Sequence, residues 1–520
     1  MTAKDYELSK GLPKTTTSIC PECKKLIEAK LLERDGAVVI EKTCDEHGFF
    51  SDIYWSDVEL FLKAEDFAFD GIGLVDPHTQ CGETECNAYV EIGGKRFPMT
   101  SSTGLANIDL TNRCNMRCPI CFANANAAGY VYEPDYETVV RMLEMLRNER
   151  PIHCTAVQFS GGEPTIYPRF LDVLKKADEL GFAQIQVATN GLSFARDPQL
   201  LKDAVDAGLD TIYLSFDGVT DDIYLQARNR KMFDVKLKLI ENARKLDKPP
   251  SIVLVPTVLR SINDHQVGAI LDFAFENGDV VRGVNYQPVA FTGRISSDER
   301  QRERYTLTDL VYDVDSQTGY AGRDDWYPVP VVAPISKLVS ALLGKNMVTF
   351  TTHPHCGIAT YLFRDDDGTV TPIPRFIDVE KFSLGLYKLS KTAKNNWLKM
   401  WYKMRAMRII RKSIKKDKLP QGLKDVDIVN LIAGVLGDGS KDTLSEFSWK
   451  MMYVGGMHFQ DDYNYDVERV RRCGVHYATP DLEVIPFCAY NGGPNFRTKV
   501  ESEHSVPLDE WRAKHGDENT

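Results

Sequence analysis

The sequence predicts an α/β protein whose centre is a partial (β/α)6, TIM-like barrel. Beyond residue 105, apolar runs alternate with helix-like stretches, which is the pattern of parallel βα units. Glycines and polar residues follow several of these runs, where the carboxyl ends of parallel strands usually build binding sites. The expected strands are 106–110, 155–160, 184–190, 211–217, 251–258 and 280–288. The expected helices lie near 135–149, 169–180, 197–208, 231–246 and 264–278.

Length and composition indicate a globular protein of several parts. The chain has 520 residues, 43% of them hydrophobic and 26% charged, and we expect three regions. These are an N-terminal metal-binding domain (1–98), the barrel (99–330) and a C-terminal region (331–520). No apolar run is long enough to span a bilayer and no signal peptide is evident, so we expect a cytoplasmic location. In such a protein the twelve cysteines indicate metal ligands rather than disulfides.

Three cysteines follow the first expected strand in the spacing C-x3-C-x2-C. They are Cys114, Cys118 and Cys121, and we take them as the catalytic cysteines. Three thiolates from one loop hold a [4Fe–4S] cluster and leave one iron open. An open iron chelates S-adenosylmethionine and delivers the electron that releases a 5′-deoxyadenosyl radical. A zinc loop is the alternative, since short cysteine spacings recur in zinc sites.

Further candidates lie at the ends of the next strands. The second strand runs into a turn in which paired glycines let the backbone approach a ligand, and its glutamate is suited to accept from an ammonium group. The third and fourth strands end in polar turns, and an arginine follows that is suited to pair with a carboxylate. Each turn is ordinary alone, but their order favours a cofactor site. The residues are Gly161, Gly162, Glu163, Pro164, Asn190, Ser215, Asp217 and Arg228.

On these motifs, residues 106–290 resemble the core of the radical S-adenosylmethionine (radical SAM) superfamily. The resemblance implies that the three cysteines hold the catalytic cluster and that the turn at Gly161–Pro164 holds the methionyl amino group. It places Asn190 and Ser215 near the methionyl carboxylate or the ribose, and Arg228 on the carboxylate. Phe122, after the third cysteine, matches the aromatic residue that packs near adenine.

The N-terminal region contains a metal-knuckle pattern. Cys20 and Cys23 are followed by Cys44 and His47 in C-x2-C and C-x2-H spacings. Zinc suits three cysteines and a histidine, whereas a rubredoxin-like iron prefers four sulfurs. Cys81 or Cys86 is the alternative fourth ligand. We expect one zinc or iron ion here.

Three more cysteines lie far apart in loop-like sequence near the C-terminus. Cys356, Cys473 and Cys488 are expected to hold at least one auxiliary [4Fe–4S] cluster. The alternative is that they are buried structural cysteines, as free cysteine often is. Cys154 starts a strand and is expected to be plain core.

Residues 387–418 are strongly basic in an acidic chain. This segment carries a formal charge of +11, whereas the whole chain carries −11. Apolar residues recur every three to four positions, which predicts one basic amphipathic helix. Such a helix suits an anionic membrane surface. Packing on the protein's own core is the main alternative, and the wide apolar stripe argues against nucleic acid. The run 428–436 adds a second apolar surface.

Nearly the whole chain is also similar to archaeal tetraether lipid synthases (GDGT/macrocyclic archaeol synthases). The segments that carry this resemblance are Cys20-Pro-x-Cys23, Cys44-Asp-Glu-His-Gly, Asn112-Arg-Cys-Asn, Val157-Gln-Phe-Ser-Gly-Gly-Glu-Pro, Phe216-Asp-Gly, Leu254-Val-Pro-Thr, Arg282-Gly-Val-Asn-Tyr-Gln-Pro, His353-Pro-His-Cys-Gly and Phe487-Cys-Ala-Tyr-Asn. The chain departs from that pattern at two places. It has only Cys81 and Cys86 where the family has a group of three cysteines, and Val331 or Val332 stands where the family has a further cysteine.

This resemblance implies an enzyme that joins the terminal carbons of isoprenoid chains in archaeal glycerol ether lipids. It implies a lipid substrate, an external low-potential reductant and peripheral contact with the inner membrane face through 387–418. Other hypotheses are a radical methylase of a pterin or another small molecule, a lipid-modifying relative that makes a different cross-link, a peptide-modifying radical enzyme, and an iron–sulfur electron carrier.

Overall fold

A computed structural model describes residues 8–76, 88–296, 300–393, 398–424 and 451–516. All six predicted strands are present and pair in parallel, in the order β14-β12-β11-β10-β9-β7. Their bounds are β7 (Leu105–Thr111), β9 (Ala156–Gly161), β10 (Gln184–Thr189), β11 (Thr211–Ser215), β12 (Ser251–Val255) and β14 (Val281–Pro288). The α/β class is therefore confirmed, and the arrangement is consistent with a partial barrel.

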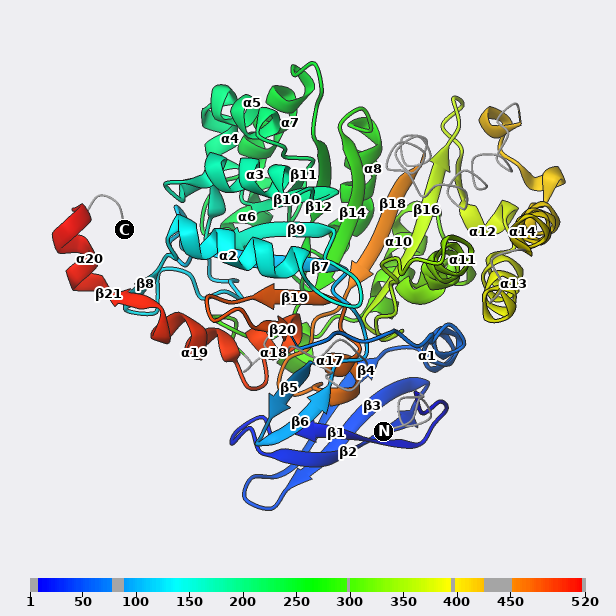
Figure 1. Cartoon of the computed structure of the whole chain (residues 1–520), viewed down its shortest axis with the longest axis horizontal. Helices are drawn as coiled ribbons and strands as arrows, with labels where there is room; N and C mark the ends of the chain where they lie inside the picture. The colour runs from blue at the N-terminus through cyan, green and yellow to red at the C-terminus, as the bar shows by residue number, and fades with distance from the viewer. Residues whose placement is uncertain (1–7, 77–87, 297–299, 394–397, 425–450, 517–520) are drawn as a thin grey trace.

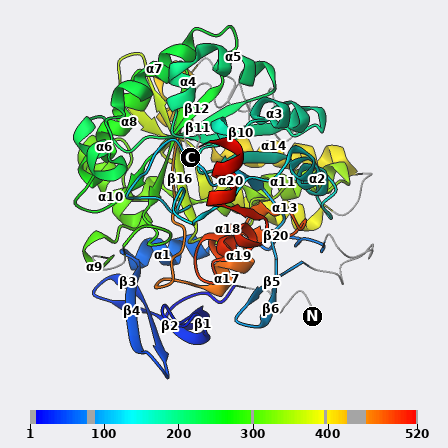
Figure 2. The same ribbon diagram turned by 90° about the vertical axis from the view of Figure 1, so that its left-hand side faces the viewer.

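The five predicted helices are also present and cover the outer face of these strands (Figure 2). They are α2 (Tyr136–Arg147), α3 (Phe170–Glu179), α5 (Pro198–Asp206), α7 (Phe233–Arg244) and α8 (Val267–Glu276). Two short helices, α4 (Leu192–Arg196) and α6 (Asp221–Arg228), also follow strand ends. The strands are nearly continuous runs of buried residues because helices cover one face and side chains fill the other.

The C-terminal part of the chain adds strands to both edges of this sheet (Figure 1). β18 (Met452–Met457) pairs in parallel with β14, and β19 (Val475–Ala478) pairs in parallel with β7. The segment between them, which contains α17 (Val467–Arg471), therefore connects the two edges of the six-stranded core. Antiparallel strands continue the sheet outward: β15 (Tyr327–Pro328), β16 (Gly357–Arg364), β17 (Val370–Pro372) and β20 (Val484–Pro486). Residues beyond 330 thus share a sheet with the barrel core.

The N-terminal region is a four-stranded antiparallel sheet followed by a helix, at the bottom of Figure 1. Its elements are β1 (Lys14–Ile19), β2 (Leu26–Arg34), β3 (Ala37–Cys44), β4 (Gly48–Trp55) and α1 (Val58–Glu65), and a hairpin follows with β5 (Tyr89–Ile92) and β6 (Lys95–Pro98). Thr16 and Tyr54 donate to the carboxylate of Asp466 at 2.6 and 3.0 Å. These bonds hold the N-terminal sheet against the start of α17.

The remaining elements lie around this frame. They are β8 (Tyr130–Tyr132), β13 (Thr257–Val258), α9 (Arg300–Glu303), α10 (Leu307–Thr318), α11 (Ala333–Leu343), α12 (Ile373–Phe376), α13 (Val379–Thr392), α14 (Lys399–Ser413), α18 (Phe487–Asn491), α19 (Phe496–Glu503), β21 (Ser505–Pro507) and α20 (Leu508–His515).

The basic segment forms two packed helices, α13 and α14, instead of the single helix we expected. Leu386, Leu389 and Ile410 are buried in one cluster with Leu338 and Leu342 of α11. Much of the apolar stripe is therefore used for internal packing, although Met400 and Trp401 are exposed. No helix in the described ranges is long and apolar enough to cross a membrane. The run 428–436 lies outside the described residues.

Candidate functional site

The three-cysteine loop is held in shape by side chains from elsewhere in the fold. Asn126 accepts from the backbone N–H of Cys114 at 2.9 Å and donates back to the Cys114 carbonyl at 2.7 Å. Arg294 donates to the Cys118 carbonyl at 3.0 Å. Burial raises the pKa of the Cys114 and Cys118 thiols, because desolvation disfavours the thiolate. A bound metal ion or iron–sulfur cluster would offset this cost of desolvation, because thiols that coordinate a metal are deprotonated.

Two glycines form the turn after β9 because no other residue fits. Gly161 has a φ of +129°, and a Cβ there would lie 2.2 Å from the carbonyl oxygen of Thr111. A Cβ on Gly162 would lie 2.1 Å from the carbonyl oxygen of Arg113. The turn therefore packs directly on the strand-to-loop connection that leads into Cys114, with Gly162 N–H donating to Thr111 at 2.7 Å. Both glycines line the central cavity.

Glu163 is buried and its carboxylate is fully engaged within the protein. Oε1 accepts from the hydroxyls of Thr165 and Thr189 at 2.6 and 2.7 Å, and Oε2 accepts from the N–H of Asn190 at 2.9 Å. Its side chain thus joins the ends of β9 and β10 and does not line the cavity. Pro164 follows it in a buried short turn. Burial raises the pKa of Glu163.

Arg228 is likewise committed to an internal partner. Its guanidinium makes a bidentate pair with the fully buried carboxylate of Asp217, at 2.7 Å for both bonds, and donates to the carbonyl of Ile120 at 2.8 Å. Bidentate pairs of this kind are strong and directional. Asp217 and Arg228 therefore brace the cysteine loop against the end of β11. Arg228 and the neighbouring Ser215 still line the cavity wall.

Lys236, which the sequence reasoning missed, also lines the cavity. Its side chain is buried, and Nζ donates to the carbonyl of Asn190 at 2.6 Å. Burial lowers its pKa to about 7, against the opposing effect of the nearby Asp217 carboxylate. A signal was available, because Lys236 falls on the apolar stripe of α7 with Leu239, Ile240 and Ala243. A lysine at such a position is rarely there for packing alone.

One cavity of about 290 Å³ brings together the predicted cofactor-binding residues of several strand ends. The predicted residues that line it are Cys114, Cys118, Cys121, Phe122, Gly161, Gly162, Asn190, Ser215, Arg228 and Cys488. Glu163, Pro164 and Asp217 lie behind its wall, as described above. The aromatic rings of Phe459 and Phe487 also line it and stack with their centroids 3.9 Å apart. The cavity thus extends from the cysteine loop to the C-terminal segment.

The three C-terminal cysteines come together beside this cavity. Burial raises the pKa of Cys473, and the nearby Cys488 and Cys356 raise it further. Burial also raises the pKa of Cys488 to about 11. Arg469 donates to the Cys356 sulfur at 3.5 Å, and the Gln460 N–H donates to the Cys488 sulfur at 3.4 Å. Cys154, in contrast, is buried in the main core as expected, where its thiol donates to the carbonyl of Ala156 at 3.2 Å.

Several buried polar atoms around the C-terminal cysteines have no hydrogen-bond partner among the described residues. They include both ring nitrogens of His458, the side-chain nitrogen of Gln460 and the hydroxyl of Tyr465. Such atoms are uncommon in native proteins and each calls for a ligand or an ordered water. The thiols and these atoms fit a bound inorganic group.

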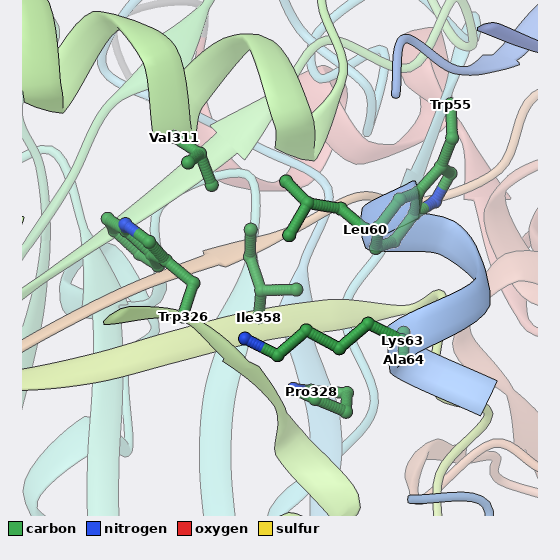
Figure 3. A pocket seen from close by; sticks show the side chains of 8 residues that line it. All are labelled: Trp55, Leu60, Lys63, Ala64, Val311, Trp326, Pro328 and Ile358. Carbon is green, nitrogen blue, oxygen red and sulfur yellow. The ribbon is translucent and has the colours of Figure 1, made fainter. Parts of the chain in front are cut away.

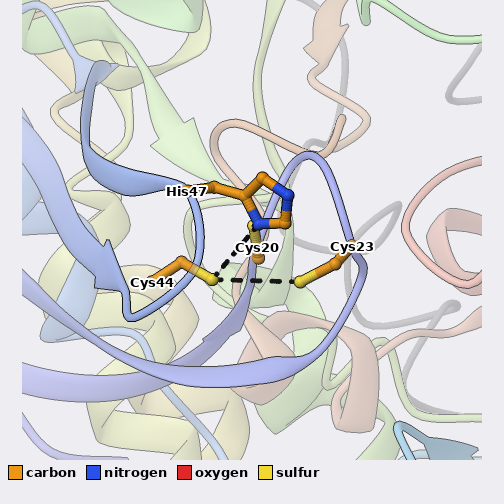
Figure 4. A group of neighbouring side chains, drawn as sticks. All are labelled: Cys20, Cys23, Cys44 and His47. Carbon is orange, nitrogen blue, oxygen red and sulfur yellow. Dashed lines mark hydrogen bonds between the residues drawn. The ribbon is translucent and has the colours of Figure 1, made fainter.

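In the N-terminal sheet, Cys20, Cys23, Cys44 and His47 converge (Figure 4). Their ligand atoms all lie within 4.8 Å of one another. Hydrogen bonding with His47 lowers the pKa of Cys44 to about 6, which favours the thiolate that binds metal. Three sulfurs and one nitrogen form a set that zinc prefers. The alternative ligands, Cys81 and Cys86, lie outside the described residues.

A second cavity, between α1, α10 and β16, is too small for a substrate (Figure 3). It measures about 10 Å³, and the rings of Trp55 and Trp326 face it. That is about the volume of one water molecule. Its lining residues are apolar apart from Lys63 and the two tryptophans.

Comparisons with known proteins agree with this geometry. A profile of the radical SAM superfamily matches residues 108–274, and a profile of the HMPTM N-terminal zinc ribbon domain matches residues 12–56. The 7,8-dihydro-6-hydroxymethylpterin dimethyltransferase of Methanocaldococcus jannaschii is 44% identical over 513 residues, which are 97% of this chain and 98% of the relative. The GTP 3′,8-cyclase of Chlorobaculum tepidum is 27% identical over 43% of this chain and 66% of its own length. Among solved structures, Streptococcus suis SuiB bound to S-adenosylmethionine has a TM-score of 0.33 at 19% identity, covering 43% of this chain and 45% of SuiB.

Two expectations are wrong in the light of these findings. Coupling of archaeal ether lipids is contradicted, because the relative that matches almost the whole chain is named for a pterin substrate. The expected lipid partner is wrong for the same reason. The membrane contact through 387–418, which we expected from the basic amphipathic pattern of that segment, is not shown by the structure. The alternative of a radical methylase acting on a pterin is the better supported one.

Proposed function

The chain belongs to the radical SAM superfamily and to the family of the Methanocaldococcus dihydropterin dimethyltransferase, and we propose that it too methylates a dihydropterin. The 44% identity over nearly the whole of both chains carries this proposal. It is an enzyme that uses a [4Fe–4S] cluster and S-adenosylmethionine, with a metal ion in the N-terminal zinc ribbon.

The cavity supports a compact substrate. Its volume of about 290 Å³ is close to the lower limit of small-molecule sites, about 300 Å³. Because the cluster cysteines and the glycine turn line the same cavity, the remaining space suits a small ring system. The stacked rings of Phe459 and Phe487 give a flat heterocycle a face to pack on.

We assign the cofactor side of the cavity to the strand ends of β7, β9 and β10. Cys114, Cys118 and Cys121 hold the cluster, which supplies the electron that splits S-adenosylmethionine when both are bound. Gly161 and Gly162 let the backbone approach the methionyl group. Because Arg228 is paired with Asp217, Lys236 is the cation that we assign to the methionyl carboxylate.

The C-terminal cysteines are proposed to hold an auxiliary [4Fe–4S] cluster. Cys356, Cys473 and Cys488 supply three thiols, and the unpartnered polar atoms nearby fit a bound inorganic group. Arg469 lies against Cys356 and would offset thiolate charge. Cys488 lines the cavity, so this group would adjoin the substrate.

The proposal is tested by expressing the chain in bacterial cells and analysing their pterins by mass spectrometry. Pterins heavier by one or two methyl groups are expected with the parent chain and absent with Cys118→Ala expressed at the same level. Unchanged pterins from cells containing soluble, cluster-loaded parent protein would contradict the proposed function.

A further inference from the structure

Two buried amide side chains on neighbouring strands carry unused hydrogen-bonding capacity at the cavity wall. Asn107 of β7 and Gln158 of β9 face each other in the parallel register of the two strands. They are 1% and 8% exposed, and both line the cavity. Gln158 Nε2 donates to Asn107 Oδ1 at 2.7 Å.

Once the two amides are bonded to each other, one amide nitrogen and one amide oxygen of the pair have no partner among the described residues. These atoms are Nδ2 of Asn107 and Oε1 of Gln158. Rotating both amides by half a turn would exchange the two roles but would still leave one amide N–H and one carbonyl. A buried polar group without a partner destabilises the fold, so the pair is costly unless something binds it. The pair therefore presents an adjacent donor and acceptor to whatever fills the cavity.

A third polar group lies on another strand of the same cavity wall. The hydroxyl oxygen of Tyr213, on β11, accepts from the side-chain amides of Asn285 and Gln287, the latter at 3.5 Å. Its own proton is thus available for a further acceptor. Burial raises the pKa of Tyr213, so the phenol stays protonated. Tyr213 and Gln287 both line the cavity.

We propose that Asn107 and Gln158 bind the pyrimidinone edge of a dihydropterin. This inference rests on the proposed function and assigns the substrate end of its site. The edge offers a carbonyl oxygen beside a ring N–H and an amino group, which complements one donor beside one acceptor. Asn107 donates to the ring carbonyl, and Gln158 accepts from the ring N–H or the amino group. No charged side chain is needed, because the ring is neutral.

The test is equilibrium binding of 7,8-dihydro-6-hydroxymethylpterin to the full-length, cluster-loaded protein. Asn107→Leu and Gln158→Met keep the approximate shapes and remove the hydrogen bonds. Each should weaken pterin binding by about ten- to one-hundred-fold, the usual effect of leaving a ligand's polar group unpaired. Binding of S-adenosylmethionine should be unchanged, which separates recognition of the pterin from general damage.

Two further variants sharpen the test. Gln186→Met is the matched control, because Gln186 occupies the position opposite Gln158 on β10, is equally buried and does not line the cavity. It should bind the pterin like the parent. Gln158→Glu removes the N–H that bonds Asn107 Oδ1, so it should also bind the pterin more weakly than the parent.

The possible failures are distinguishable. In one outcome the parent protein methylates the pterin, and Asn107→Leu and Gln158→Met bind it as tightly as the parent does. This outcome would overturn the Asn107–Gln158 assignment alone. It would mean that ordered water satisfies the amide pair. A parent protein that neither binds nor methylates the pterin would overturn the proposed function and the assignment together.

Discussion

Lys236 donates a hydrogen bond to the main-chain oxygen of Asn190 across 2.6 Å, and this bond connects α7 to the end of β10. Among the residues described, the Lys236 ammonium group lines the cavity without a paired carboxylate. Arg228, in contrast, is paired with Asp217, and Arg294 is bonded to carbonyls of the cysteine loop. Its place beside the predicted turn residues gives the site a charge that the sequence motifs did not reveal. The cost of burying it is compensated if a carboxylate binds there.

The first prediction concerns this lysine. Lys236→Met should weaken binding of S-adenosylmethionine by about ten- to one-hundred-fold, because a charge-assisted hydrogen bond is worth about 1.5–3 kcal/mol. Iron content should stay at the parent level. Isothermal titration with the cluster-loaded protein measures this. Lys238→Met is the control, since Lys238 is on the same helix but is exposed beside Glu241. Equal affinities of the parent and Lys236→Met would show that another group binds the carboxylate.

The second prediction concerns the glycine turn. Gly162→Ala should abolish deoxyadenosine formation, since a Cβ would lie 2.1 Å from the Arg113 carbonyl and force apart the turn and the cysteine loop. Overpacking of this kind costs about 1–3 kcal/mol. Gly322→Ala, whose Cβ would meet nothing closer than 3.7 Å, should behave like the parent. Activity measured by liquid chromatography decides the matter, and an active Gly162→Ala would mean that the close packing is dispensable.

Much of the fold was predictable because its signals are local. The strand ending in Gly161 and the helix containing Leu239 follow periodic patterns that short segments specify by themselves. The cysteine loop and the glycine turn were predictable for the same reason. Pairing of β18 and β19 with opposite edges of the core was not, because it depends on contacts between residues more than 150 positions apart.

The site was predictable only in part, for a physical reason. Glu163 and Arg228 were expected to touch the cofactor, but charged residues at strand ends also satisfy each other, as Arg228 does with Asp217. The Asn107–Gln158 pair lies within buried strands and matches no motif, so the sequence does not show that it lines the cavity. Lys236 could have been found from its place on the apolar stripe of α7. The substrate was misjudged because segments along nearly the whole chain resemble tetraether lipid synthases. The basic segment 387–418 suggested a lipid as well, but its apolar residues largely pack on α11.

The third prediction separates the two sets of cysteines. Cys356→Ala, Cys473→Ala or Cys488→Ala should each lower the iron content by about one cluster while deoxyadenosine formation continues. Methylated pterin should be lost. Cys154→Ala removes a fully buried thiol from the main core and should keep all its iron. Iron and sulfide analysis with electron paramagnetic resonance measures the outcome, and full iron in all three variants would exclude an auxiliary cluster there.

The fourth prediction concerns stability and pH. Burial raises the pKa of Glu149 from 4.5 to about 8. One carboxylate oxygen accepts from Thr103 at 2.9 Å, and the other has no partner among the described residues. The folded protein therefore binds a proton that the unfolded chain releases, so this group's contribution to stability is lost as pH rises from about 4.5 towards 8.

Glu149→Gln removes this titration. Its unfolding temperature should exceed that of the parent by more at pH 8 than at pH 5, as measured by differential scanning fluorimetry. Glu144→Gln, on the partly exposed face of α2, is a control that should show no such change. A parent and a Glu149→Gln protein whose unfolding temperatures run parallel across this range would show that Glu149 is ionised and compensated in the fold.

The claim that S-adenosylmethionine and a dihydropterin share one cavity is tested most directly by a rate. This is the rate at which purified, reduced protein releases 5′-deoxyadenosine from S-adenosylmethionine, measured with and without 7,8-dihydro-6-hydroxymethylpterin. Because one cavity adjoins both the cysteine loop and the Asn107–Gln158 pair, the dihydropterin should raise this rate, and Cys118→Ala should abolish it. A rate that the dihydropterin leaves unchanged would contradict the claim that the two ligands share this cavity.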